Sequence, residues 1–199
     1  MQQDHTRKEI NNEVAACRNL FEKKTRDYGT SWRVMRMPSL TDQIYIKAGR
    51  IRSIQESGEN RVGDSLQSEF VAMVNYAVIA LIQRDLIGGV AEKMPMEMPM
   101  ELPLDKAMEL YDKHLQATID LMMDKNHDYG EAWREIRIES MVDLILMKLM
   151  RIKQIEDNNG HTLVSEGVEG GYMDIINYSL FCLVRLTELS GQNKKEERK

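Results

Sequence analysis

The chain has 199 residues and a formal net charge of −5, so its length allows one domain or two small ones. The acidic balance argues against a nucleic-acid site that relies on a broadly basic surface. Cys17 and Cys182 lie far apart in helical patterns, which predicts buried free thiols in a reducing compartment rather than disulfides or a metal cluster.

The first seven residues are polar, unlike a signal peptide. The apolar runs at residues 71–82 and 175–184 are too short to span a bilayer. We therefore expect a cytoplasmic protein that does not enter a membrane.

The first predicted helix covers residues 8–26, and its pattern returns at residues 105–127. Asp27-Tyr28-Gly29 with Trp32 follows the first of these helices, and Asp128-Tyr129-Gly130 with Trp133 follows the second, 101 positions later. A glycine in this place is a typical stop signal at the C-terminal end of a helix. Because this register is kept through the next helix, the chain is a duplicated module.

The second predicted helix covers residues 40–56 and, in the other copy, 140–157. Its apolar positions recur at spacings of seven and three, which favours one buried stripe; they are Ile44, Ile51 and Ile54, matched by Ile145, Ile152 and Ile155. The third predicted helix covers residues 65–85 and 168–189. It is apolar enough to lie at the centre of the core.

Residues 88–104 separate the copies and carry Pro95, Pro99 and Pro103 among Met and Glu. A proline at every fourth position forbids a regular helix, so we expect an extended linker. The first repeat then covers residues 1–87 and the second 105–192, and the charged tail at 193–199 is expected to fray. Strand signals are nearly absent, which predicts an all-α, internally duplicated helical bundle of two three-helix repeats packed as a pseudo-twofold pair.

Four acidic residues stand out in the second repeat. Glu166, Glu169 and Asp174 lie at the start of its third helix, and Asp143 lies early on its second. Carboxylates on neighbouring helices are how a helical protein can bind Mg²⁺. The alternative is that these acids only interact favourably with helix N-termini. Asp174 favours the metal, because an acid in an apolar run is costly to bury unless it is paired or metal-bound.

Cationic and aromatic side chains of the second repeat are candidates for substrate contacts. Lys148 and Arg151, with Lys125, have the chemistry to hold a polyphosphate, or they face solvent and pair with nearby aspartates. Tyr129 and Trp133 have the ring faces to stack on a base, or they are wedges in the core. Both readings stay open for each group.

The two copies differ at the acidic positions of the third helix. Asp64 stands where Glu166 does, but other matched positions are Ala72 for Asp174, Gln67 for Glu169, and Glu69 for Gly171. We therefore predict a degenerate acidic site in the first repeat and a better-preserved one in the second.

The ordered pattern across both repeats resembles the nucleotide-modification-associated domain family of phages and bacteria. In the second copy its residues are Lys125, Asp128, Tyr129, Gly130, Trp133, Asp143, Lys148, Arg151, Glu166, Asp174, Asn177 and Tyr178. We count Asp128 and Asn177 among the substrate-binding candidates on this ground. Gly167 stands where the family usually has Ser, and Gly170 stands where it usually has Asp. Loss of that Asp would impair metal binding unless Glu169 takes its place.

More distantly, the chain is similar to the all-alpha nucleoside triphosphate pyrophosphatases of the MazG and dimeric dUTPase type. That resemblance implies a Mg²⁺-dependent hydrolase that splits a nucleoside triphosphate into monophosphate and pyrophosphate. Glu166 and Asp174 would be catalytic, and the metal ligands would be Asp143, Glu166, Glu169 and Asp174. The alternative is a non-catalytic module that binds a nucleotide or a protein partner, or a purely structural bundle. The base, the activity and any further oligomerisation stay open.

Overall fold

The computed structural model describes residues 2–61, 63–88, 101–164 and 167–196. These residues form α-helices and two short 3₁₀ helices, and they contain no strand. The elements of the first repeat are α1 (Gln2–Tyr28), η1 (Ser31–Val34), α2 (Met37–Ser57) and α3 (Leu66–Ile87). Those of the second are α4 (Leu104–Tyr129), η2 (Ala132–Glu135), α5 (Ile138–Asp157) and α6 (Val168–Glu196). The predicted all-α class is confirmed.

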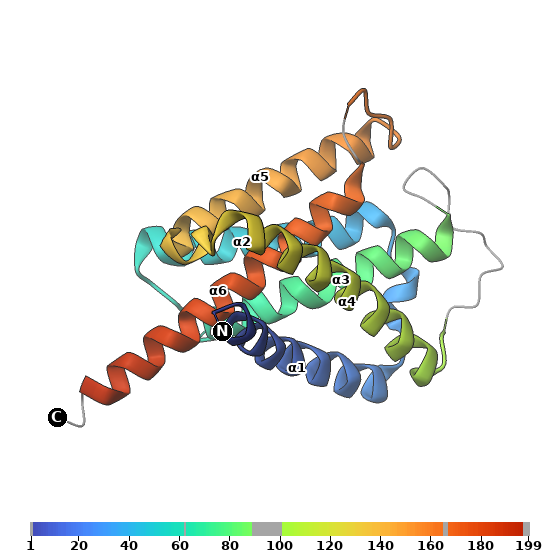
Figure 1. The fold of residues 1–199 in the computed structure, drawn as a ribbon. Helices are drawn as coiled ribbons and strands as arrows, with labels where there is room; N and C mark the ends of the chain where they lie inside the picture. Colours follow the sequence, from blue (N-terminus) through green and yellow to red (C-terminus); the bar gives the residue numbers. More distant parts are fainter. Residues whose placement is uncertain (1, 62, 89–100, 165–166, 197–199) are drawn as a thin grey trace.

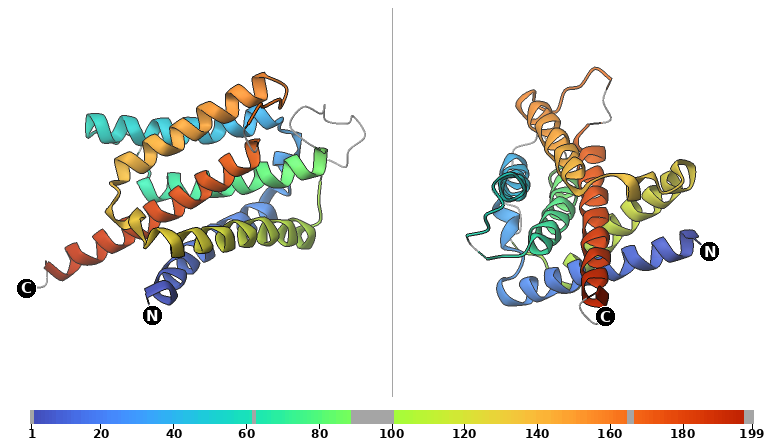
Figure 2. Two further views of the ribbon diagram at one scale, coloured as in Figure 1. Left: turned by 45° about the horizontal axis from the view of Figure 1, so that its top comes forward. Right: turned by 90° about the vertical axis from the view of Figure 1, so that its left-hand side faces the viewer.

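Corresponding helices of the two repeats pair with each other in three layers. Figure 2 (left) shows α2 beside α5, α3 beside α6 in the middle, and α1 with α4 on the other side, and the same pairs are in contact. The middle pair packs against the layer of α2 and α5, so these four helices form the centre of the bundle (Figure 1). This arrangement confirms the duplicated bundle expected from the sequence.

The Asp-Tyr-Gly motifs end the first helix of each repeat, as predicted. Gly29 and Gly130 adopt left-handed backbone angles, with φ of 63° and 57°, which a side chain disfavours. One end differs from the prediction, because α6 continues to Glu196 through part of the tail that we expected to fray. The tail contains good helix formers, and Thr187 near this end donates a hydrogen bond to Glu13 of α1.

The central helix α3 is mostly apolar, and 13 of its 22 residues are buried. By length and composition it is the one helix among residues 2–61, 63–88, 101–164 and 167–196 that could cross a membrane. The apolar run that we noted at residues 71–82 is only part of this helix. However, 67% of its most apolar window is buried inside the protein, as expected for a core helix. Cys17 and Cys182 are free and buried, as predicted.

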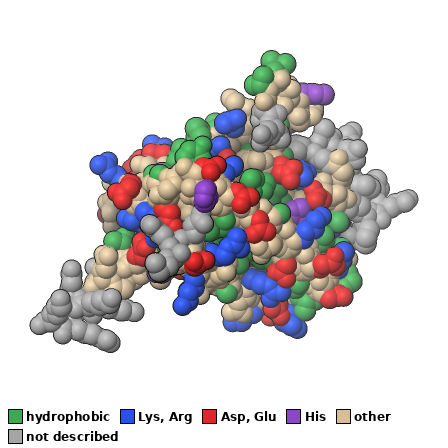
Figure 3. All heavy atoms as spheres, viewed as in Figure 1, with side chains coloured by type: hydrophobic (Ala, Val, Ile, Leu, Met, Phe, Trp, Pro, Cys, Tyr) green, Lys and Arg blue, Asp and Glu red, His purple; other side chains and the backbone are tan. Residues whose placement is uncertain are grey.

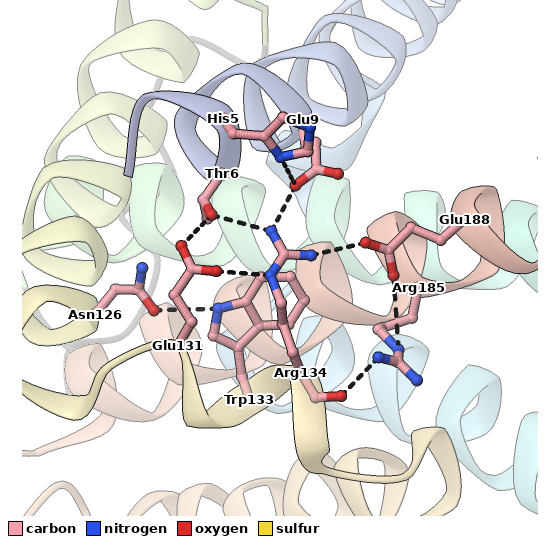
Figure 4. A network of polar contacts seen from close by, with 9 residues as sticks. All are labelled: His5, Thr6, Glu9, Asn126, Glu131, Trp133, Arg134, Arg185 and Glu188. Carbon is pink, nitrogen blue, oxygen red and sulfur yellow. Dashed lines mark hydrogen bonds and ion pairs between the residues drawn. The ribbon is translucent and has the colours of Figure 1, made fainter. Parts of the chain in front are cut away.

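Arg134 of η2 joins three elements that are distant in sequence (Figure 4). Its guanidinium donates to Glu131 in the preceding turn, to Glu9 and Thr6 of α1, and to Glu188 of α6, at 2.6 to 3.0 Å. Thr6 also donates to Glu131, which is buried. This network fixes the start of α1 against the second repeat.

Candidate functional site

A charged cleft of about 280 Å³ lies between the second half of α5 and the beginning of α6. Its walls carry three charged side chains and three glycines, with a few aliphatic residues; the charged and glycine positions are Lys148, Arg151, Asp174, Gly167, Gly170 and Gly171. The cleft belongs entirely to the second repeat. The face in Figure 3 shows cationic and acidic side chains interspersed, without a broad basic area.

Helix geometry explains the positions of the two cations. Lys148 and Arg151 are three residues apart on α5, so they share one face of that helix. The glycines surround the N-terminus of α6, where unpaired backbone N–H groups and the helix dipole favour an anion. Gly171 is also required by packing, because a Cβ atom there would lie 2.9 Å from Cγ1 of Ile152. Short side chains thus bring α6 close to α5 and leave the cleft open.

Asp174 lies in the cleft and is paired with a cation. Its Oδ2 is 2.6 Å from Nζ of Lys148, and the two side chains are 26% and 20% exposed. We expected an acid in this apolar run to be either ion-paired or metal-bound. The structure shows the ion pair, and the Asp174 side chain is only partly buried. Arg151 is exposed and has no hydrogen-bond or ion-pair partner among the described residues.

The matching cations of the first repeat, Lys47 and Arg50, are both paired with one carboxylate, that of Glu69. Glu69 accepts a hydrogen bond from Arg50 and lies 3.3 Å from Nζ of Lys47. The Glu69 side chain is only 9% exposed, and it stands at the position that Gly171 occupies in the second repeat. The first repeat therefore places one carboxylate against both cations, whereas in the second repeat Asp174 pairs with Lys148 and Arg151 has no described partner.

Of the predicted metal ligands that the structure describes, Asp143 and Glu169 do not join Asp174 in the cleft. Asp143 lies 3.6 Å from Arg52 of α2, and Glu169 accepts a 2.6 Å hydrogen bond from Arg84 of α3. Both acids thus pair with arginines of the other repeat, and neither lines the cleft. Glu166 lies outside the described residues. Among the residues that are described, no group of three or more His, Cys, Asp and Glu side chains is placed to hold a metal ion, so the Mg²⁺ site, whose predicted ligands include Glu166, stays a prediction.

The aromatic candidates have different surroundings. Tyr129 is 73% exposed, whereas Trp133 is buried and its ring stacks on Phe181 at 4.5 Å between centroids. The indole N–H of Trp133 donates to Asn126 at 3.1 Å, and Arg134 lies over the ring. Trp133 therefore has the environment of a core wedge, which was one of its two readings.

The remaining candidates lie away from the cleft walls. Lys125 and Asp128 are exposed, and Asp128 is 3.3 Å from its neighbour His127. Asn177 is buried, and its side-chain oxygen has no hydrogen-bond partner within the described part of the chain. The structure thus gathers Lys148, Arg151 and Asp174 in one place and leaves these three outside it.

One polar cluster near the cleft is not evident from the sequence. Glu156 of α5 accepts hydrogen bonds from Thr41 of α2 at 2.7 Å and from Tyr172 of α6 at 3.2 Å. Burial raises the pKa of Glu156 above its ordinary value, although these two hydrogen bonds oppose the shift. In the sequence, the spacing of four between Ile152 and Glu156 shows only that both lie on one face of α5. The contact of Glu156 with α2 depends on how the two repeats pack, which the spacing does not show.

A family model described as nucleotide modification associated domain 1 matches residues 24–84 and again residues 125–186. The two matches fall one in each repeat and together cover more than half of the chain. The second match contains the cleft residues of α5 and α6. Neither curated proteins nor solved structures give a match, so the more distant likeness to the MazG type remains a prediction.

Proposed function

The chain belongs to the nucleotide modification associated domain 1 family, and from this premise we propose that it binds a nucleoside phosphate in the cleft of the second repeat. The phosphate groups lie between α5 and the N-terminus of α6. Arg151 offers a fork of N–H donors, and Lys148 offers a point charge. The observation that carries the proposal is this pair of cations beside an open, glycine-lined helix N-terminus.

The first repeat supplies a model for how such a cation pair holds an anion. There the carboxylate of Glu69 takes the place between Lys47 and Arg50. In the second repeat Gly171 provides no carboxylate, so a phosphate oxygen can take the corresponding position. A volume of about 280 Å³ lies just below the usual range for small-molecule pockets, which begins at about 300 Å³. It suits a phosphate chain, with the sugar and base toward the opening.

Calorimetric titration of the full chain with pyrophosphate, deoxynucleoside triphosphates and nucleosides tests this proposal. The phosphate-bearing ligands are expected to bind, and their affinity should fall as salt rises. Arg151→Gln should weaken them at least about tenfold, the loss expected for a charge-assisted hydrogen bond. Lys125→Gln, an exposed cation outside the cleft, is the matched control. Equal affinities for Arg151→Gln and the unaltered protein would refute the site.

A second candidate function is Mg²⁺-dependent pyrophosphohydrolysis of a nucleoside triphosphate, modified deoxynucleotides included. Asp174 favours it, because a carboxylate in the same cleft as Lys148 can orient an attacking water molecule and accept its proton. Lys148 and Arg151 would neutralise charge that develops on the phosphate oxygens. The described acids offer no assembled metal set, so no step is assigned to the metal.

Pyrophosphate release from a panel of triphosphates, with and without Mg²⁺, separates the two candidates. Turnover that disappears in Asp174→Asn while nucleotide binding persists supports the enzyme. Binding without any release leaves the protein as a nucleotide-binding module.

A further inference from the structure

The first repeat contains a second cavity, of about 290 Å³, between α1, η1 and α3. Most of its wall is apolar or aromatic and includes Phe21, Tyr28, Trp32, Tyr76 and Ile79. These residues surround the Asp-Tyr-Gly motif of the first repeat. We refer to this cavity as the Trp32 pocket.

The second repeat fills the matching position with one of its own aromatic rings. Ile79 corresponds to Phe181, and the ring of Phe181 stacks on Trp133 at 4.5 Å with an interplanar angle of 7°. Trp133 in turn corresponds to Trp32. Because Ile79 has no ring, Trp32 lacks this stacking partner. Phe181 shows that a flat aromatic ring fits against the tryptophan of this fold.

The polar side of Trp32 also lacks a partner. Its indole N–H is buried and makes no hydrogen bond within the part of the chain that the structure describes, and the side chain is only 8% exposed. In the second repeat the equivalent N–H donates to Asn126. The matching Thr25 instead donates its hydroxyl to the carbonyl oxygen of Phe21. This N–H has almost no accessible surface, so a ligand in the pocket would meet the ring of Trp32 and not its N–H group.

The charges at the Trp32 pocket are mixed, because Lys24 is exposed and lines its wall, whereas the cation near Tyr76 is paired with a carboxylate. Tyr76 lines the pocket, and Nζ of Lys47 lies 6.0 Å from the centre of its ring. Lys47 is already paired with Glu69. A phosphate next to Tyr76 would therefore meet a neutralised cation and the negative charge of Glu69.

We propose that the Trp32 pocket binds a planar heterocycle, as a free nucleobase or a nucleoside. The two repeats then divide one composite site between them. The first repeat keeps the ring-binding half and closes the anion-binding half with Glu69. The second repeat keeps the anion-binding half and fills the ring-binding half with Phe181. This inference does not depend on the phosphate cleft, because the two cavities share no residue.

The test uses the full chain with four nucleosides, their free bases and their monophosphates, observed by saturation-transfer NMR. At least one base or nucleoside is expected to bind. Ile79→Phe, which copies the residue of the second repeat, should weaken that ligand at least about tenfold, because a ring already occupies the face of Trp32. Ala72 is half-buried and lines the same pocket, so Ala72→Leu should narrow the pocket and weaken the ligand. This variant replaces Ile79→Phe in the test if Ile79→Phe folds poorly. Lys148→Met should leave this ligand unaffected and weaken only phosphate ligands.

Fluorescence locates the ligand, because the chain has two tryptophans. In Trp133→Phe the emission comes from Trp32 alone, and the ligand should change it. The proposal is overturned if no base or nucleoside binds, or if folded Ile79→Phe binds the ligand as the unaltered chain does. Loss of binding in Lys148→Met would instead place the ligand in the phosphate cleft.

Discussion

Lys148 and Asp174 face each other across the helix pair of the second repeat, with 2.6 Å between Nζ and Oδ2. The carboxylate therefore competes with any phosphate for the same ammonium group. Asp174→Asn should tighten pyrophosphate binding about two- to fivefold, since a partly exposed ion pair is worth up to about 1 kcal/mol. Calorimetry at low salt measures this. Unchanged or weaker binding would show that Asp174 does not compete for the phosphate site.

The exchange of Glu69 for Gly171 between repeats predicts that the cleft can be closed by one substitution. In Gly171→Glu the new carboxylate should pair with Arg151, as Glu69 pairs with Arg50, and nucleotide affinity should fall at least about tenfold. Gly171→Ala is the control, because its Cβ atom meets the same Ile152 side chain without adding charge. Similar losses in both variants would assign the effect to packing instead.

The network around Arg134 predicts a large contribution to stability. Arg134→Met leaves the buried Glu131 carboxylate without its guanidinium partner, and removing one member of such a pair costs about 3–5 kcal/mol when it is fully buried. Because Arg134 is 20% exposed, we expect about 2–3 kcal/mol less unfolding free energy in urea. Arg26→Met, whose exposed pair with Glu22 lies within α1, should change it by less than about 0.5 kcal/mol.

The same network makes stability depend on acidic pH. Burial acts to raise the pKa of Glu131, but hydrogen bonds from Thr6 and Arg134 outweigh it and hold this pKa below its ordinary value of 4.5. A lowered pKa in the folded state contributes stability above the unfolded-state pKa, and this is lost as pH falls through the folded value. Urea titrations should show Glu131→Gln clearly less stable than the unaltered protein at pH 7 and closer to it below pH 4.5. A stability gap that is independent of pH would contradict this.

The two thiols should be unreactive while the protein is folded. Burial raises the pKa of Cys17 to about 12 and that of Cys182 well above its ordinary value. A chromogenic disulfide reagent at pH 8 should therefore label neither thiol until urea unfolds the chain, and then both. Fast labelling without urea would show that the helices around Cys17 or Cys182 open readily.

Much of the fold can be predicted from the sequence, but less of the site. Helical spacing places Lys148 and Arg151 on one face of α5, and the structure confirms that they lie together. The spacing cannot show that Asp143 and Glu169 turn toward Arg52 and Arg84, because those arginines belong to the other repeat. Nor does it reveal that Phe181 covers Trp133, since both positions only read as apolar.

The sequence by itself determined the duplication, the helices and the Asp-Tyr-Gly stops, because these depend on periodicity and on the left-handed conformation that glycine tolerates. Only the tertiary structure decided which acids remain near the charged cleft and which repeat keeps which cavity. Those outcomes depend on the contacts of helices that are distant in the chain. A difference of one side chain at such a contact, Glu69 against Gly171 or Ile79 against Phe181, fills a site or leaves it open.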